Sequence, residues 1–245
     1  MNPVIEKMKQ HRSIRKYTDK PISEMMLKML IECGQAAASS SFIQAYSIVQ
    51  VIDSDSRSTI AKAAGGQSWI KDAAAFLVIC ADLNRIDHCC RKTNATSLEG
   101  YTEHFIAATV DAALMAQNLL LAAESEGLGG VFIGGIRNAP DVIADVLKLP
   151  ELVYPVFGLC LGWPDHDPET KPRMPVEMIL HQDQYRSDNI PSNVDEYDSL
   201  MANYYASRLK NQRMSNWSIQ TCEAIQGKKR EHMLGFLQQR GFLKH

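Results

Sequence analysis

The segment of residues 102–126 constrains the fold more than any other part of the chain. It has the pattern of a long helix that stops at Gly127, and most of its circumference carries alanine, leucine and other small or apolar residues. Asp111, Gln117 and Asn118 interrupt the apolar run and make it too polar for a membrane span. A helix with so little polar surface must be buried on several sides. We expect a core helix that an obligate homodimer covers, or one that is buried wholly within a single subunit.

Helix and strand patterns alternate along the rest of the chain. Apolar residues at helical spacing predict helices, and short runs rich in valine, isoleucine and leucine predict buried strands. The helical segments are residues 23–38, 55–65 and 139–149, and the strand-like segments are residues 46–53, 74–82, 129–135 and 154–164. This alternation indicates mixed layers of helix and sheet.

The chain is predicted to form a single domain, residues 1–245. Its 45% hydrophobic content is enough for a sizeable core. Residues 183–200 are polar and interrupted by proline, and we interpret them as a linker to a C-terminal helical extension that starts at about residue 187. The N-terminus lacks a signal-peptide pattern, so cytoplasm is the default location.

The cysteines and histidines predict no metal site. The six cysteines include no CxxC pair, and we interpret them as reduced thiols. The adjacent Cys89 and Cys90 are either a redox-active pair or two unpaired thiols in a polar loop, and the second interpretation is favoured. The seven histidines are scattered without the spacing of metal ligands.

Positive charge is concentrated at the C-terminal end. Residues 201–245 carry eight Lys and Arg against two Glu, a balance of +6, whereas residues 1–200 have a balance of −8. A basic tail can serve nucleic acid, a membrane surface or an anionic small molecule. Apolar residues such as Trp217 and Phe236 are interleaved with the charges, which indicates a packed element rather than a solvated arm.

Several standard chemistries have no motif in this chain. The glycine-rich residues 127–135 fail the G-x-G-x-x-G pattern because Phe132 replaces the third glycine, and they enter a strand instead of a helix. No P-loop, HExxH or GxSxG pattern occurs. If the chain is an enzyme, an organic cofactor must carry its chemistry.

Three short segments remain as candidates for recognising phosphate. They are the basic residues 11–22, "HRSIRKYTDKPI", the serines of residues 38–41, "ASSS", and residues 171–173, "KPR". Arginine offers a fork of donors, lysine a point charge, and serine hydroxyls complete such a shell. Each segment alone is better interpreted as a solvated turn or helix end.

Taken together and in order, these segments resemble the nitroreductase superfamily. The resemblance rests on "HRSIRKYTDKPIS", "SSSFIQAYSIV", "GGQSW", "AAESEGLGGVFIGGIRN", "FGLCLGWP" and "KPRMP", and it covers nearly the whole chain. It points to the group of NADPH-dependent, oxygen-insensitive nitroreductases and flavin reductases. It implies an α+β fold with a central, mostly antiparallel sheet flanked by helices, assembled as an intertwined homodimer with FMN at the interface.

The resemblance also assigns residues to the cofactor and the substrate. It places His11, Arg12, Ser13, Arg15, Ser39, Ser41, Gln67, Ile133, Gly134, Gly135, Lys171 and Arg173 at FMN. It places Ser41 and Phe42 beside the substrate pocket. In the tail, "YYASRLKNQRMSNWS" resembles an excursion that binds pyridine nucleotide, which assigns Arg208, Lys210 and Arg213 to the 2′-phosphate of NADPH.

The activity implied by this resemblance is ping-pong hydride transfer. Reduced nicotinamide gives hydride to the flavin, and a nitroaromatic, a quinone or a free flavin then takes the electrons. No side chain is predicted to act as catalyst. One alternative is a dedicated flavin reductase that supplies reduced FMN to a partner. Another alternative is a non-enzymatic module that binds nucleic acid through the basic tail. The acidic body argues against it, and so does the lack of an RNP or helix-turn-helix signature.

Overall fold

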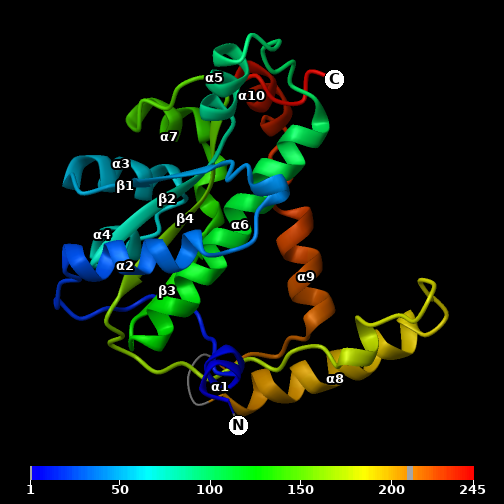
Figure 1. Ribbon diagram of the computed structural model, residues 1–245. Coiled ribbons are helices and arrows are strands. Elements are labelled where there is room, and N and C mark those ends of the chain that lie inside the picture. Colours follow the sequence, from blue (N-terminus) through cyan, green and yellow to red (C-terminus); the bar gives the residue numbers. More distant parts are fainter. Residues whose placement is uncertain (1, 209–211) are drawn as a thin grey trace. The chain divides into compact units, whose positions relative to one another are not determined.

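The computed structural model describes residues 2–208 and 212–245. It divides the chain into two compact units. Unit 1 consists of Met1–Pro168 and Arg230–His245, and unit 2 consists of Glu169–Lys229. Figure 1 labels the helices and strands of both units.

Unit 1 is built on a four-stranded antiparallel sheet with the order β1-β2-β4-β3. The strands are β1 (Tyr46–Gln50), β2 (Ala75–Asp82), β3 (Gly129–Ile133) and β4 (Val153–Gly162). Every residue of β2 is buried, so both faces of the sheet are covered. The predicted α+β fold with an antiparallel sheet is confirmed.

Side chains of β2 alternate between two hydrophobic clusters. Leu77 and Ile79 pack with α6 (Thr102–Ser125) and α2 (Glu24–Gln35), whereas Phe76 and Val78 pack with residues of α3 (Ser54–Ala63) and α7 (Pro140–Val146). Successive strand residues point to opposite faces, which explains the alternation. Figure 1 shows α6 along one side of the sheet and α3 and α7 along the other.

The long helix α6 is the core helix that the sequence predicts. Its length and a mean hydropathy of 1.6 would by themselves suit a membrane span. Instead it packs against α2 and β2, with residues such as Ala112, Ala116 and Leu119 fully buried. Ile106, Val110 and Leu114 lie on successive turns and stay 43 to 48% exposed, so one stripe of α6 is apolar and open.

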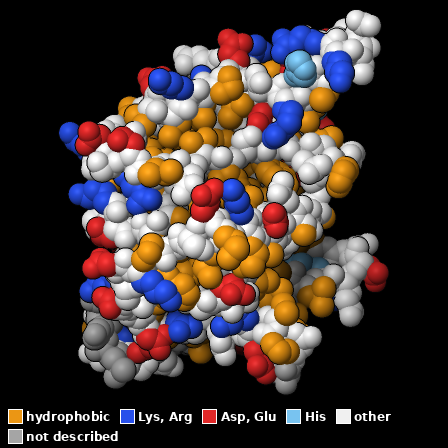
Figure 2. All heavy atoms as spheres, turned by 60° about the vertical axis from the view of Figure 1, so that its left-hand side comes forward, with side chains coloured by type: hydrophobic (Ala, Val, Ile, Leu, Met, Phe, Trp, Pro, Cys, Tyr) orange, Lys and Arg blue, Asp and Glu red, His pale blue; other side chains and the backbone are white. Residues whose placement is uncertain are grey.

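The remaining elements of unit 1 are short helices on the flanks of the sheet. They are α1 (Pro3–Lys9), α4 (Trp69–Asp72), α5 (Asn84–Lys92), α10 (Met233–Gln239) and the 3₁₀ turns η1 (Ser40–Phe42) and η2 (Gly134–Asn138). Figure 2 shows apolar side chains in patches among charged ones on one face of the molecule.

Unit 2 contains the turn η3 (Val176–Met178) and the helices α8 (Ile190–Ser207) and α9 (Trp217–Gln226). Its small core comes from one face of α8, where Tyr197, Met201 and Tyr205 are buried on successive turns.

Three local predictions were wrong. Cys89 and Cys90 lie on α5 rather than in a loop. The buried Asp87 stabilises this helix of polar sequence, because it pairs with Arg91 one turn further along the helix at 2.7 Å and accepts the N–H of Leu98 outside it at 2.9 Å. Residues 183–200 are not all linker, since α8 starts at Ile190 and its proline lies in the first turn, where proline is compatible with a helix.

The third error concerns the basic tail. Phe236 and Leu237 are buried, but the side chains of Met214 and Ile225 are 102% and 72% exposed. Helix α9, which contains Ile225, has no buried residue. The apolar residues between the charges therefore do not all belong to a packed element.

Candidate functional site

The basic N-terminal segment, residues 11–16, has no regular secondary structure and is anchored at its centre. Ile14 is buried, and its N–H donates to the carbonyl of Gly130 on β3 at 2.9 Å. Gly129 makes this approach possible, because a Cβ there would lie 2.4 Å from the Ile14 side chain. In an extended chain Ser13 and Arg15 lie on the opposite side from Ile14. Burial raises the pKa of Tyr17, whose hydroxyl donates to the Ile14 carbonyl at 2.7 Å.

His11 and Arg12 both pair with carboxylates in unit 1. His11 Nδ1 lies 2.6 Å from Oε1 of Glu124, a residue of α6 that is only 8% exposed. The Arg12 guanidinium contacts the exposed carboxylate of Asp167 and the carbonyl of Gln10. Arg12 Nε is buried without a hydrogen-bond partner in the described part of the chain. Arg12 and Glu124 line a pocket of about 130 Å³.

Arg15 lies near α4, and Gln67 lies against the end of α3. The Arg15 guanidinium carbon is 5.8 Å from the centroid of the Trp69 ring, and Trp69 Nε1 is buried without a partner among the described residues. Gln67 Nε2 donates to the carbonyl of Ala64 at 2.8 Å. A Cβ at Gly135 would lie 2.2 Å from that nitrogen and 2.4 Å from the backbone oxygen of Ala64, which cannot move aside, so only glycine lets the two segments pack together. These contacts connect the predicted Gln67 and Gly135.

Ile133 and Gly134 connect β3 to the turn that contains Gly135. Ile133 is the last residue of β3 and is fully buried, and Gly134 begins η2. The three predicted residues, Ile133, Gly134 and Gly135, therefore lead from the core of the sheet to the loop that contains Gln67.

The serine segment forms a tight turn that a buried carboxylate holds. Asp111 on α6 is 1% exposed and accepts the backbone N–H groups of Ser40 at 2.8 Å and Ala45 at 3.1 Å. Ser39 Oγ accepts the N–H of Gln44 at 3.2 Å. Ser41 and Phe42 have φ angles of 46° and 59°, which non-glycine residues rarely adopt. The turn presents the Phe42 ring at 81% exposure.

Two predicted groups of residues are far apart within one chain. The serine turn is attached to Asp111, and His11 is attached to Glu124, on the same straight helix. At a rise of 1.5 Å per residue, these two carboxylates are about 20 Å apart along the axis of α6. The fold of a single chain therefore does not bring the serine turn to His11.

Unit 2 carries the other predicted cations. Tyr197 Oη donates to the carbonyl of Pro172 at 2.9 Å and so fixes the segment that contains Lys171 and Arg173. Burial raises the pKa of Tyr197, and nearby Arg173 opposes this shift. Lys171 Nζ lies 5.7 Å from the centroid of the Tyr205 ring.

The predicted nucleotide residues gather at the end of α8. The guanidinium of Arg208 lies 5.8 Å from the Tyr204 ring, and that of Arg213 lies 4.3 Å from the Tyr205 ring. Lys210 lies outside the described residues.

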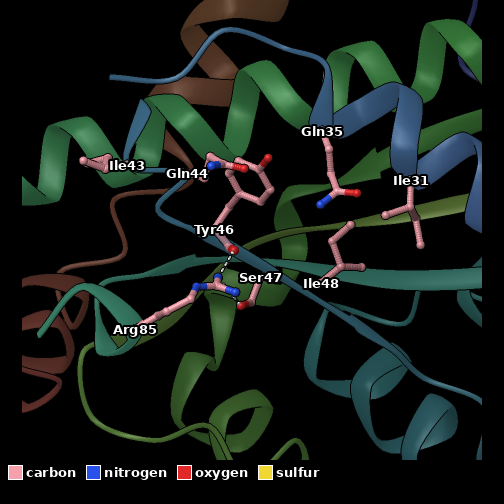
Figure 3. Close-up of a pocket in the computed structure, with 8 residues that line it drawn as sticks. All are labelled: Ile31, Gln35, Ile43, Gln44, Tyr46, Ser47, Ile48 and Arg85. Carbon is pink, nitrogen blue, oxygen red and sulfur yellow. Dashed lines mark hydrogen bonds between the residues drawn. The ribbon is translucent and has the colours of Figure 1, made fainter. Parts of the chain in front are cut away.

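A pocket of about 410 Å³ lies beside the serine turn (Figure 3). It is lined by Ile31, Gln35, Ile43, Gln44, Tyr46, Ser47, Ile48 and Arg85. The Arg85 guanidinium donates to the Tyr46 carbonyl at 2.7 Å and to Ser47 Oγ at 3.2 Å. This pocket borders on the edge strand β1 and contains no residue that the sequence assigned to a ligand.

The profile of the nitroreductase family matches residues 8–163, and that of the family's C-terminal domain matches residues 171–245. The chain belongs to the nitroreductase family. The two matches together cover both the sheet-building part and the C-terminal part of the chain, and the resemblance stated from the sequence is confirmed.

Full-length relatives agree with this assignment. The chain is 44% identical to the NADPH-flavin oxidoreductase of Vibrio harveyi over 100% of both chains. It is 40% identical to the oxygen-insensitive NADPH nitroreductase of Salmonella typhimurium over 99% of both. The crystal structure of NADPH:FMN oxidoreductase from Vibrio harveyi complexed with NAD⁺ matches with a TM-score of 0.90 and 40% identity over 100% of both chains.

The sequence assigned no role to four residues that contact the predicted ligand residues or their direct neighbours within their own units. They are Trp69, Asp111, Glu124 and Tyr205. A signal for the two acids was present, because a carboxylate in an otherwise apolar helix must find a partner when it is buried. The partners themselves are distant in sequence, so that signal does not identify them.

Proposed function

We propose that this chain is an NADPH-dependent, FMN-containing oxidoreductase that reduces nitroaromatics, quinones or free flavins. Its membership of the nitroreductase family supports this proposal. So do full-length relatives named NADPH-flavin oxidoreductase and NADPH nitroreductase.

The observation that carries the proposal is a pair of buried donors without partners. Arg12 Nε and Trp69 Nε1 are both buried, and neither has a hydrogen-bond partner in the described part of the chain. A buried donor that stays unsatisfied costs about 1–3 kcal/mol, so a ligand that accepts from it is stabilised. Separately, Gly135 packs closely against Gln67 and Ala64, which leaves no room for a side chain there. Unpaired donors fit an anionic ligand such as FMN, and the glycine turn fits the flat ring of such a ligand.

The basic residues fit the phosphate of FMN. Lys171 and Arg173 form no ion pair with another described residue, and Arg15 lies on an aromatic ring rather than on a carboxylate. A phosphate with nearly two negative charges needs several such cations, because charge-assisted hydrogen bonds are about twice as strong as neutral ones. We assign His11, Arg12, Ser13 and Arg15 to the phosphate and ribityl chain, together with Lys171 and Arg173.

When bound, FMN supplies the redox chemistry, since it accepts hydride from NADPH and passes electrons to the acceptor. The chain contributes binding and orientation. Gln67 addresses the pyrimidine edge of the ring, and Ile133, Gly134 and Gly135 offer backbone close to it. Arg208, Lys210 and Arg213 bind the 2′-phosphate of NADPH. The exposed Phe42 ring, next to Ser41, borders the acceptor pocket.

We further propose that the active unit is a homodimer in which each copy completes the site of the other. The distance of about 20 Å along α6 between Asp111 and Glu124 keeps the serine turn away from His11 in the same chain. A second copy brings its own Ser39 and Ser41 to the cofactor. The exposed apolar stripe of α6 offers the surface for this contact.

In this proposal, residues 1–245 form one nitroreductase-like domain. The helical extension from about residue 187 contributes to nucleotide binding. The location is cytoplasmic, and the protein needs neither nucleic acid nor a membrane.

An absorption spectrum of the purified protein tests the proposal. An oxidised flavin spectrum that NADPH bleaches is expected, with reoxidation on addition of a nitroaromatic or a quinone. A colourless protein that does not bind added FMN would overturn it, and salt-sensitive affinity for nucleic acid in such a protein would favour a binding module instead.

The relatives carry both flavin-reductase and nitroreductase names, so a dedicated flavin reductase is the second candidate. Steady-state kinetics with free FMN as the only acceptor separate the two. Turnover with FMN that equals or exceeds turnover with nitroaromatics and quinones favours the flavin reductase.

A further inference from the structure

Two predicted phosphate ligands of unit 2 lie on the same aromatic ring. Lys171 Nζ is 5.7 Å from the centroid of the Tyr205 ring, and the guanidinium carbon of Arg213 is 4.3 Å from it. Both distances are within the range of cation–π attraction. The segment assigned to FMN and the segment assigned to NADPH thus meet at one side chain.

The Tyr205 ring is held firmly enough to position both cations. Tyr205 is 2% exposed and packs with Tyr197 and Met201 in the core of unit 2. A buried ring has little rotamer freedom, so cations that lie on it are restrained as well.

The Arg213 segment is also attached through its backbone. Arg213 N donates to the carbonyl of Tyr205 at 3.3 Å, and Gln212 Nε2 donates to the carbonyl of Ala206 at 2.9 Å. These bonds satisfy carbonyl groups at the C-terminal end of α8, which have no partner within the helix. Two hydrogen bonds therefore hold the segment of Arg213 at the end of α8, beside the Tyr205 ring.

The neighbouring tyrosine repeats the pattern. The rings of Tyr204 and Tyr205 have centroids 5.4 Å apart, and Arg208 lies 5.8 Å from the Tyr204 ring. Among the described residues, no ion pair joins a carboxylate to Lys171, Arg208 or Arg213. Each of these cations lies near an aromatic ring instead. Cations held in this way keep their charge available for phosphate groups.

We propose that Tyr205 is a positioning residue that couples the FMN-phosphate site to the NADPH 2′-phosphate site. This inference rests on the proposed function, because it takes Lys171 as a ligand of FMN and Arg213 as a ligand of NADPH. Without the ring, the side chains of Lys171 and Arg213 are both free to move. Each ligand must then restrict the motion of its own cation when it binds, and this entropic cost lowers its affinity. One substitution thus weakens the binding of two different ligands.

Equilibrium binding to the full-length chain tests the coupling. FMN is titrated by flavin fluorescence, and NADP⁺ and NAD⁺ are titrated by calorimetry on the FMN-saturated protein. Tyr205→Leu should weaken FMN and NADP⁺ binding about three- to tenfold each, and leave NAD⁺ binding nearly unchanged. Tyr205→Phe keeps the ring and should restore both affinities.

Met201→Ala is the matched control, because Met201 is similarly buried on the same face of α8 and has no aromatic ring to offer either cation. It should lower the melting temperature and leave both affinities unchanged. Equal losses of affinity in Met201→Ala and Tyr205→Leu would reduce Tyr205 to a packing role and overturn the proposal. An unchanged affinity for either ligand in a folded Tyr205→Leu variant would overturn it as well.

A second measurement applies even if Tyr205→Leu does not fold. Tyr205→Met also removes the ring but fills the buried space with a flexible apolar side chain, and it should weaken FMN and NADP⁺ binding as Tyr205→Leu does. Unchanged affinity for either ligand in Tyr205→Met would refute the coupling. A wild-type chain that binds no FMN would instead refute the proposed function, so the two failures are distinguishable.

Discussion

Asp111 Oδ1 on the core helix α6 accepts the backbone N–H of Ser40 at 2.8 Å. Its other carboxylate oxygen accepts the N–H of Ala45 at 3.1 Å, so one buried acid closes both ends of the serine turn. The positive φ angles of Ser41 and Phe42 lie between these two bonds. We infer that the carboxylate maintains a strained turn that presents Phe42 to solvent.

Asp111→Asn should destabilise the protein and loosen this turn. The amide can accept one of the two hydrogen bonds, but its NH₂ group then faces the other N–H. We expect a loss of about 1.5–3 kcal/mol in the free energy of unfolding, measured by urea denaturation. Glu103→Gln, an exposed change on the same helix, is the control and should change stability by less than about 0.5 kcal/mol. A loss no larger than that of the control would contradict the role of Asp111.

Arg15→Ala should weaken FMN binding. If Arg15 donates to the charged phosphate, its removal costs about 1.5–3 kcal/mol of binding free energy, measured by fluorescence titration. Lys16→Ala removes a neighbouring exposed charge and should have a much smaller effect. Riboflavin, which lacks the phosphate, should bind much more weakly than FMN. Equal affinities for riboflavin and FMN would show that the phosphate is not the main point of attachment.

Arg208→Ala and Arg213→Ala should each raise the KM for NADPH and barely change that for NADH. The two donors differ by one 2′-phosphate, and both guanidinium groups lie at the end of α8, each over a tyrosine ring. Lys228→Ala removes an exposed charge elsewhere in the basic tail and serves as the control in steady-state kinetics. If the wild type does not distinguish the donors, or both variants lose the two activities alike, the tail does not recognise the 2′-phosphate.

Val110→Lys should dissociate the proposed homodimer. Val110 is 48% exposed in the middle of the apolar stripe of α6, and an unpaired charge there is costly to bury in an interface. Light scattering after gel filtration should give twice the chain mass for the wild type and the chain mass for the variant. Val142→Lys changes an exposed apolar residue of α7 and should leave the dimer intact. A flavin-loaded wild-type monomer would refute the dimer.

Stability should fall at alkaline pH because of a buried thiol. Burial raises the pKa of Cys80 from its ordinary value of 9.0 to about 12. The folded state thus keeps a proton that the unfolded state loses, so the stabilisation is complete below pH 9 and is lost as the pH rises toward 12. One such group contributes a slope of about −1.4 kcal/mol per pH unit to the free energy of unfolding. Cys80→Ala should reduce this slope in urea denaturation, whereas Cys33→Ala, which changes an exposed thiol, should not.

The sequence by itself predicted the elements whose patterns are local. The small residues of α6 and the glycine after it predicted the core helix, and the runs of β2 and β4 predicted buried strands. The order of the short motifs predicted the family, which the profile matches confirmed. The predicted ligand residues stay predictions, and the structure adds that Gln67 and Gly135 pack together.

Only the tertiary structure decided which distant residues meet. Nothing in the local pattern of α6 pairs Asp111 with Ser40 or Glu124 with His11, because such pairs depend on how the helix lies against loops far away in sequence. The same holds for Lys171 and Arg213, which share the Tyr205 ring. Helix and strand patterns reflect neighbours a few residues apart, whereas buried charges and aromatic rings take whichever partner the packed chain brings within reach.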